Sequence, residues 1–325
     1  MGAPRKYLPH NSVIFVTFSL EQGLLLLSNP LCLAIIKSCL ARAQCLFPVR
    51  ISHFMVHANH VHLVLVVISP EHACKFIGHF KAESAHRFNQ LFGWKKRTIW
   101  CEGYDSPVVL TPVRALIAIA YIYSNPAKDH QEESINKYPG LSSWRMFRSG
   151  LGTKQWKFIR RPAFRLLAKD AHSLAGYTRE CARILKGTKA LQTFRLEPDA
   201  WLEAFGISSE EEKKSWNDTM VTRVRTLEER YQRVRQRDKK RVVGRQALLR
   251  RSMTFDYQSK RGGKRMWCLS EDRKLRVKFI HFLKKLIAQA REVYTNWHVG
   301  DYSVAYPPGL FPPSQPRLFE PLEVW

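Results

Sequence analysis

Asn59-His60-Val61-His62-Leu63-Val64-Leu65-Val66-Val67-Ile68 is the most informative stretch of this chain. It is an apolar run, rich in β-branched residues, that contains two histidines two positions apart, and this composition favours a strand. Side chains alternate between the two faces of a strand, so His60 and His62 point to one face and Val61 to the other. The stretch therefore predicts a strand that carries a pair of preformed metal ligands.

The sequence around this strand predicts a regular succession of strands and helices. In order they are a strand over 12–18, a helix over 30–44, strands over 50–56 and 60–68, a helix over 70–92, a fourth strand after the basic aromatic stretch 94–100, and a helix from Pro112 closed by Pro126. The order β-α-β-β-α-β-α predicts an α+β fold of the ferredoxin-like, split βαβ type. We expect an antiparallel sheet with helices on one face.

The second half of the chain has a different texture. Helical patterns are found at 177–186, 198–205, 210–241, 245–251 and 273–297, and the end of the chain from 307 onward is rich in proline. We place a boundary near Ser149-Gly150. This predicts an N-terminal domain over 1–150 and a basic, mainly helical extension over 151–325.

The amino-acid composition indicates which kinds of partner the protein has. In a chain of 325 residues, 53 Lys and Arg against 27 Asp and Glu give a formal net charge of +26, which favours polyanions, and nucleic acid above all. A ribosome-associated protein or a merely solubilising charge would have the same composition. The 7 cysteines are odd in number and include no Cys-x-x-Cys pair, so neither a disulfide framework nor a thiolate zinc site is predicted.

No apolar segment approaches the ~20 residues that are needed to span a bilayer. The first residues also lack the apolar core of a secretory signal. These features predict a cytoplasmic protein that does not associate with membranes.

Tyr121-Ile122-Tyr123-Ser124-Asn125-Pro126 is the second informative stretch. Tyrosine can form covalent intermediates, and a tyrosine beside a metal-bound phosphate is a candidate nucleophile toward phosphorus. Asn125 lies four residues after Tyr121, on the same face of a continuing helix, and could supply an oxygen ligand. Local sequence alone favours the simpler interpretation of Asn125-Pro126 as a helix stop, and it does not decide whether Tyr121 or Tyr123 is exposed.

The two stretches together resemble a known family. Met55-Val56-His57-Ala58-Asn59-His60-Val61-His62 is similar to the His-hydrophobic-His strand of the HUH single-tyrosine transposases, and Tyr121 to Pro126 resembles the Tyr-Ile-x-x-Asn-Pro signature of their REP-associated branch. A later segment, Tyr138-Pro139-Gly140-Leu141-Ser142-Ser143-Trp144, is similar to the family's Tyr-Pro-x-Ser-Ser-aromatic segment with one extra residue. Where the family usually has Met-Pro before Asn59, this chain has His57-Ala58. The resemblance covers about residues 10–150.

The resemblance implies a function and its residues. Tyr121 would be the nucleophile, and His60, His62 and Asn125 would hold a divalent ion, Mg²⁺ or Mn²⁺. Residues 1–150 would be the catalytic domain of a transposase that cleaves and rejoins single-stranded or hairpin DNA of repeat elements through a 5′-phosphotyrosine. Family members act as monomers or dimers, so the resemblance does not decide whether this protein forms a homodimer.

Two groups of basic residues are candidate DNA contacts. One combines cationic and flat side chains, which suit single strands, and comprises Trp94, Lys95, Lys96 and Arg97, with Trp100 either beside them or in the core. The other is the dense basic run of the second half, with Arg233, Arg235, Lys239, Lys240, Arg241 and Arg245. A solvated helical face is the simpler explanation of this run.

Two alternatives to the transposase remain, a replication-initiator or relaxase-type nickase and a non-enzymatic nucleic-acid-binding protein derived from the transposase fold.

Overall fold

The computed structural model describes residues 6–21, 24–160, 174–250 and 266–315. Its elements are β1 (Val13–Ser19), η2 (Leu26–Ser28), α1 (Pro30–Leu46), β2 (Arg50–Val56), β3 (His60–Val66), α2 (Pro70–Phe92), β4 (Val108–Val109), α3 (Pro112–Lys128), α4 (Trp144–Arg148), β5 (Thr153–Lys157), α5 (Leu174–Gly187), β6 (Leu191–Arg195), α6 (Ala200–Ala204), α7 (Glu210–Arg237), α8 (Gly244–Arg250), β7 (Cys268–Leu269) and α9 (Arg273–His298). Arg251, the end of a predicted basic helix, lies outside the described residues.

A five-stranded sheet with the order β2-β3-β1-β4-β7 forms the centre of the protein. β3 pairs antiparallel with both β1 and β2, and β4 pairs antiparallel with β1. The first four strands thus have the predicted split βαβ order, which confirms the α+β fold class. β7, from the second half of the chain, extends the sheet by pairing parallel with β4, so the complete sheet is mixed.

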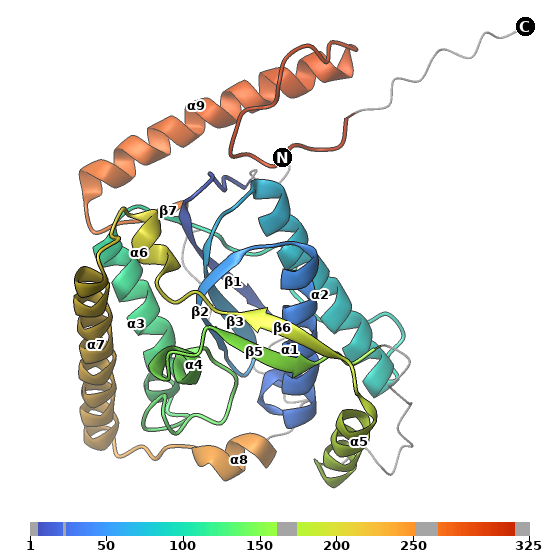
Figure 1. The fold of residues 1–325 in the computed structure, drawn as a ribbon, viewed down its shortest axis with the longest axis vertical. Helices are drawn as coiled ribbons and strands as arrows, with labels where there is room; N and C mark the ends of the chain where they lie inside the picture. Colours follow the sequence, from blue (N-terminus) through green and yellow to red (C-terminus); the bar gives the residue numbers. More distant parts are fainter. Residues whose placement is uncertain (1–5, 22–23, 161–173, 251–265, 316–325) are drawn as a thin grey trace, which may run out of the picture.

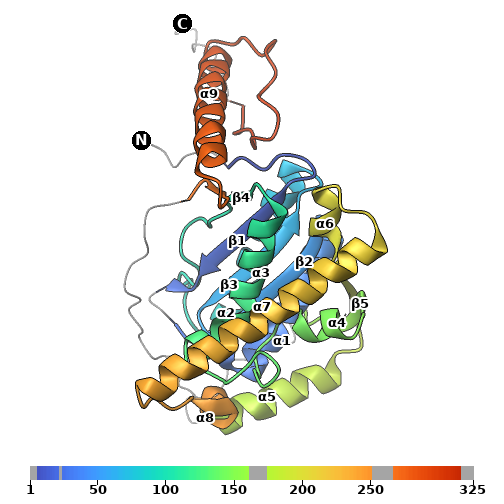
Figure 2. The same ribbon diagram turned by 90° about the vertical axis from the view of Figure 1, so that its left-hand side faces the viewer.

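Helices cover both faces of this sheet. Alternation along the strands sends Ile14, Val16 and Leu63 into a core with α1 and α2, which lie side by side on one face (Figure 1). The opposite alternation sends Val13 and Val64 toward α3, while α6 packs beside α3 against β2 and β3, and α7 packs outside α3 (Figure 2). The expectation of helices on one face was therefore wrong, because α3, which belongs to the first 150 residues, covers the face opposite to α1 and α2, and α6 and α7 of the C-terminal half add to its layer.

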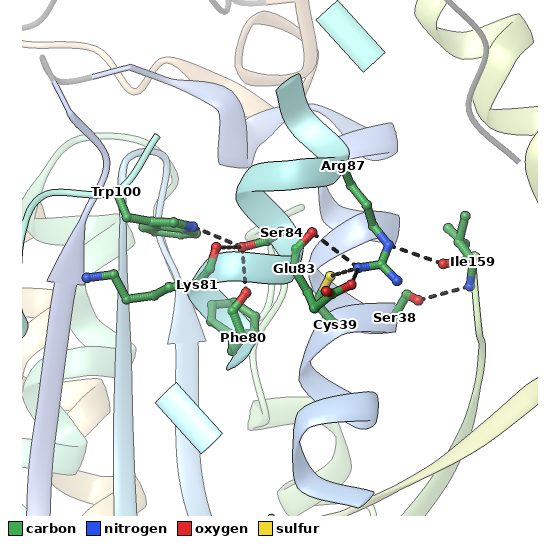
Figure 3. Close-up of polar contacts among 9 residues, drawn as sticks. All are labelled: Ser38, Cys39, Phe80, Lys81, Glu83, Ser84, Arg87, Trp100 and Ile159. Atoms are coloured by element: carbon green, nitrogen blue, oxygen red, sulfur yellow. Dashed lines mark hydrogen bonds and ion pairs between the residues drawn. The ribbon is translucent and has the colours of Figure 1, made fainter. Parts of the chain in front are cut away.

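A polar brace inside the first layer joins α1, α2 and the chain after β5 (Figure 3). Arg87 on α2 is 2% exposed, and its guanidinium pairs with Glu83 at 2.6 Å and donates to the carbonyl of Ile159 at 3.2 Å. The amide of Ile159 in turn donates to Ser38 Oγ on α1 at 2.9 Å. A buried arginine with its donors satisfied in this way is costly to unpair, so the segment after β5 is fixed against the two helices.

The second half of the chain builds on the first. β5 and β6 form a two-stranded antiparallel ribbon whose Trp156 and Phe194 join the core on the α1 side. Met220 and Val224 of α7 pack in the core that contains α3. Helix α9 lies at the opposite end of the molecule from α8 in both views (Figures 1 and 2). The division of labour between residues 1–150 and 151–325 stays a prediction.

The fourth strand, predicted without bounds after residues 94–100, is the pair Val108–Val109, and the residues before it contact β1 through the isolated bridge Thr17–Asp105. Two predicted boundaries were wrong. Helix α7 ends at Arg237, and the positive φ of Lys239, 51°, turns the chain back. Helix α3 continues through Pro126 to Lys128 instead of closing at the proline.

Candidate active site

His60 and His62 lie at the start of β3, between β1 and β2. His60 is the register partner of Ser19, and His62 is the partner of Thr17 on β1 and Met55 on β2. Both imidazoles are on the face that α3 covers, and their ring centroids lie 4.7 Å apart. A strand flanked on both sides cannot shift its register, so the sheet holds the two rings in place.

Neighbouring groups engage the Nδ1 atom of each ring. His60 Nδ1 lies 2.7 Å from Asn59 Oδ1, and because a carboxamide oxygen only accepts, the proton resides on Nδ1. His62 Nδ1 lies 2.9 Å from the hydroxyl of Thr17, which can accept in the same way. This arrangement leaves the Nε2 lone pairs for another partner, as second-shell groups do for histidine ligands.

Helix α3 brings Tyr121 and Asn125 to the same place. The ring of Tyr121 meets that of His62 edge to face, with the centroids 6.2 Å apart. Asn125 follows one turn later and is 2% exposed. Pro126 removes only one intrahelical donor near the end of α3, and the amides of Asp129 and Gln131 still donate to the carbonyls of Asn125 and Pro126. Asn125 therefore remains helical, at the spacing that the sequence suggested.

Two buried polar atoms at this place have no hydrogen-bond partner within the described residues. They are His62 Nε2 and Asn125 Oδ1. Burial, followed by the charges of neighbouring His57 and Lys128, holds the pKa of His60 well below its usual value, and burial with the charges of His60 and Lys128 does the same for the pKa of His62. Neutral imidazoles and an amide oxygen are able to bind a cation, so this donor set fits a divalent ion.

The described part of the chain contains no cluster of three or more His, Cys, Asp or Glu side chains suited to a metal. A closed structural site of the zinc-finger type is therefore not found there. Two imidazoles and one amide instead make an incomplete set, which leaves positions open for substrate oxygens.

The two tyrosines of the signature have opposite environments. The side chain of Tyr121 is 37% exposed, whereas Tyr123 is 0% exposed. Tyr123 Oη lies 2.8 Å from His53 Nδ1 and 2.7 Å from Ser143 Oγ, and burial raises the pKa of its hydroxyl. Tyr123 thus belongs to a buried polar network, and Tyr121 alone of the two presents its side chain to solvent.

The buried network also makes stability depend on pH. Burial lowers the pKa of His53 to about 3, whereas an unfolded histidine titrates near 6.5. Between these values the unfolded chain binds the additional proton, so stability falls as the pH is lowered from about 6.5 toward 3. We expect His53→Gln to flatten this dependence by about 1 kcal/mol per pH unit, measured by urea unfolding at several pH values. His86→Gln, at an exposed position on α2, is the matched control, and equal slopes in both variants would contradict the assignment to His53.

Lys128 at the end of α3 contacts the exposed tyrosine. Its ammonium donates to Tyr121 Oη at 3.0 Å and lies 4.8 Å from the ring centroid. Partial burial works against the charge of Lys128, but the hydrogen bond and the charge of Tyr121, together with Asp129, raise its pKa overall. The ammonium is therefore a fixed positive charge beside the phenol oxygen, where it would stabilise a phenolate.

Replacement of this ammonium should slow any reaction at Tyr121. We expect Lys128→Gln to lower the rate about tenfold, because the negative charge on the attacking phenol oxygen is then without its adjacent cation. Lys128→Arg should recover most of the rate. Rates of adduct formation measure both effects, and an unchanged rate in Lys128→Gln would rule out a role for the ammonium.

The first group of candidate DNA contacts lies in the loop after α2. Lys95 and Lys96 are exposed, and Trp94 is partly exposed with the guanidinium of Arg97 over its ring at 4.8 Å. Trp100 is instead in the core, where its Nε1 donates to Ser84 Oγ at 2.9 Å. The loop is near the start of β3, because Trp100 bridges to Leu20 and the amide of Leu20 donates to the carbonyl of Asn59 at 2.7 Å.

The second group lies in the last turns of α7 and in the chain that follows it. Five of its six members are exposed, namely Arg233, Lys239, Lys240, Arg241 and Arg245. Arg235 is 5% exposed and therefore offers little surface to DNA. The chain after α7 docks beside the end of α3, since Val243 and Gly244 donate to the carbonyls of His130 and Gln131 at 2.8 and 3.0 Å. Segments far apart in the sequence thus place cationic side chains at the same end of the sheet as His60.

Sequence reasoning did not assign three residues to this site. Thr17 orients His62, Lys128 contacts Tyr121, and His57 lies 3.4 Å from Asp129 with its ring centroid 4.7 Å from that of His60. The position of Lys128 seven residues after Tyr121, two helical turns, was a usable signal for its contact with that ring. The role of Thr17 depends on strand register and had no local signal.

Two strand histidines that face a helix-borne tyrosine and amide form the arrangement that the resemblance implies for HUH single-tyrosine transposases. Residues 26–125 match the family model described as "Transposase IS200 like". This match confirms the resemblance at the level of that family. No curated protein matches the chain.

A solved structure described as "Structure of the REP associates tyrosine transposase bound to a REP hairpin" is similar to this one, with 18% sequence identity and a TM-score of 0.40. The similarity covers 46% of this chain and 88% of that chain.

None of the helices in the described ranges is long and apolar enough to cross a bilayer.

Proposed function

We propose that this chain is a metal-dependent single-tyrosine transposase of the REP-associated type, acting on single-stranded or hairpin DNA. The observation that carries the proposal is the convergence of exposed Tyr121 with two buried polar atoms that lack partners within the described residues, His62 Nε2 and Asn125 Oδ1. Unpaired buried polar atoms are costly in a folded protein, and functional sites are where they are retained.

Each residue of the site has a separate role in the proposed cleavage of DNA. Tyr121 Oη attacks the scissile phosphorus, the bond to the 3′ oxygen breaks, and the products are a 5′-phosphotyrosine and a free 3′-hydroxyl. Lys128 stabilises the phenolate during this attack through its hydrogen bond at 3.0 Å. A divalent ion held by His60, His62 and Asn125 would draw negative charge from the phosphate. Because the phosphotyrosine link retains a phosphodiester, the 3′-hydroxyl of the same or another strand can reverse the step without ATP.

The basic groups supply the partner surface. Lys95 and Lys96 on one side, and Arg241 and Arg245 on the other, are exposed near the end of the sheet that carries His60. They would neutralise DNA phosphates on either side of the cleaved bond, and Trp94 would stack on a base. This placement supports a role for part of the C-terminal half in holding the substrate.

The test is a denaturing gel with full-length protein, Mg²⁺ or Mn²⁺, and hairpin oligonucleotides from inverted repeats that flank the gene. With a 3′ label, the radioactivity should migrate with the protein, and with a 5′ label it should appear in a shorter fragment that ends in a 3′-hydroxyl. Binding without any adduct in either metal would leave the non-enzymatic DNA-binding protein as the function. A 5′ label on the protein would reverse the polarity and contradict the proposed family mechanism.

A further inference from the structure

A cavity of about 200 Å³ is lined in part by Tyr138, whose ring also stacks on His57. Its inner walls are the side chains of Tyr138 and Trp156, which are 5% and 6% exposed. Four cationic side chains line it, Lys37, Arg145, Lys154 and Arg245, and no acidic residue among the described ones does so.

The four cations come from separate parts of the chain. Lys37 is on α1, Arg145 on α4, Lys154 on β5 and Arg245 on α8. Within the described residues, Arg145, Lys154 and Arg245 form no ion pair with a carboxylate. Like charges gathered around a cavity repel one another, and the cavity walls focus their field on an anion placed inside. The fold therefore builds a concave site whose chemistry selects a multiply coordinated anion.

The volume decides how large this anion is. A water molecule takes about 30 Å³ of liquid, so the cavity has room for a phosphate together with part of its sugar. The flat walls of Tyr138 and Trp156 suit a nucleotide unit better than a free inorganic ion, which would need only the cations. The ligand class that fits is a phosphodiester.

Ring contacts connect this cavity to the proposed active site. Tyr138 stacks on His57 with centroids 6.3 Å apart, and His57 in turn contacts His60 at 4.7 Å. The hydroxyl of Tyr138 is tied down, since it donates to the carbonyl of Val56 at 3.0 Å. A Cβ at Gly140 would collide with the Tyr138 ring, so the absence of a side chain there keeps the wall in position. Tyr138 thus lines the cavity and contacts the proposed active site through His57.

We propose that this cavity binds a backbone phosphate of the DNA strand, one that flanks the phosphate attacked by Tyr121. The inference rests on the proposed function for the identity of the strand. It assigns β5 and α8, from the second half of the chain, a direct part in substrate binding. A strand held at both places would be fixed at two points, which positions the scissile phosphate against Tyr121.

The test compares two double variants that remove the same charge. Lys154→Gln/Arg245→Gln removes two cations of the cavity, and Lys284→Gln/Lys285→Gln removes two exposed cations of α9, at the far end of the molecule (Figure 1). Dissociation constants of full-length proteins for a single-stranded oligonucleotide are measured over a range of salt. The cavity variant should bind about tenfold more weakly at low salt, and its salt slope should be shallower by about 0.7 for each phosphate that it no longer neutralises. The α9 variant should match the wild type.

Equal slopes in the two variants would overturn the proposal. A second arm uses inorganic phosphate alone, and a thermal shift that is seen in the wild type but not in the cavity variant, without any change in DNA slope, would show a free anion site and also overturn it. The denaturing gel for the covalent adduct tests the proposed function independently of the proposed phosphate site. Adduct formation with unaltered slopes refutes only the cavity assignment, whereas altered slopes without any adduct refute only the transposase.

Discussion

Tyr121→Phe should eliminate the covalent protein–DNA adduct while leaving binding of the oligonucleotide unchanged. The substitution removes one hydroxyl from a side chain that is 37% exposed, so it costs the fold little. Loss of a nucleophile typically lowers a rate by on the order of 10³-fold or more, which takes the adduct below detection on a gel. Dissociation constants measured by fluorescence anisotropy should stay within about twofold of the wild type, because the phenol contributes chemistry and not charge.

Tyr123→Phe, two residues further along the signature, is the matched control. Its hydroxyl is buried between His53 and Ser143, so removing it takes away the side-chain partner of buried His53 Nδ1 and should destabilise the protein by about 1–3 kcal/mol, although Ser143 Oγ keeps its hydrogen bonds to the backbone of Phe54. The adduct should nevertheless form, at a temperature where the variant is folded. The opposite result, in which Tyr123→Phe abolishes the adduct and Tyr121→Phe retains it, would require Tyr123 to leave its core position and would disprove the assignment.

The contrast between these tyrosines shows what the sequence could and could not predict. Alternation along β3 correctly placed His60 and His62 on one face, because a period of two residues is a local property. The burial of Tyr123 depends on His53 from β2 and Ser143 from the segment before α4. No window around the signature contains these partners, so local sequence left the choice of nucleophile open.

The second helical layer was hidden for a related reason. Helix α7 is strongly charged, and only a few of its residues, Met220, Val221 and Val224 among them, are buried against the core around α3. A narrow apolar stripe in a charged helix resembles a solvated face until its partner is known. The same applies to β5, where only Trp156 is buried and the other four residues are exposed. The basic run nevertheless stands apart from this packing, because five of the six predicted contact residues remain on the surface.

Asn125→Leu should separate the stability of the protein from its affinity for metal. In the metal-free protein, Asn125 Oδ1 is buried without a hydrogen-bond partner among the described residues, which is a cost of about 1–3 kcal/mol. A leucine of similar size removes that cost, so the metal-free variant should melt at the same temperature as the wild type or higher. Addition of Mn²⁺ should raise the melting temperature of the wild type and have little effect on the variant, because stabilisation by a ligand follows its affinity for the folded state.

Asn125→Asp should act in the opposite direction. A carboxylate beside two neutral imidazoles adds a negative charge to the ligand set, so Mn²⁺ should stabilise this variant more than the wild type at the same concentration. Without metal, the buried carboxylate should make it the least stable of the three proteins. Ser124→Ala, at a buried position on the same helix whose hydroxyl donates to the Tyr121 carbonyl at 3.1 Å, controls for local disturbance of α3. If Mn²⁺ raised the melting temperature of Asn125→Leu as much as that of the wild type, the amide oxygen would not be a ligand, and the ion would have to be held by His60 and His62 with substrate oxygens alone.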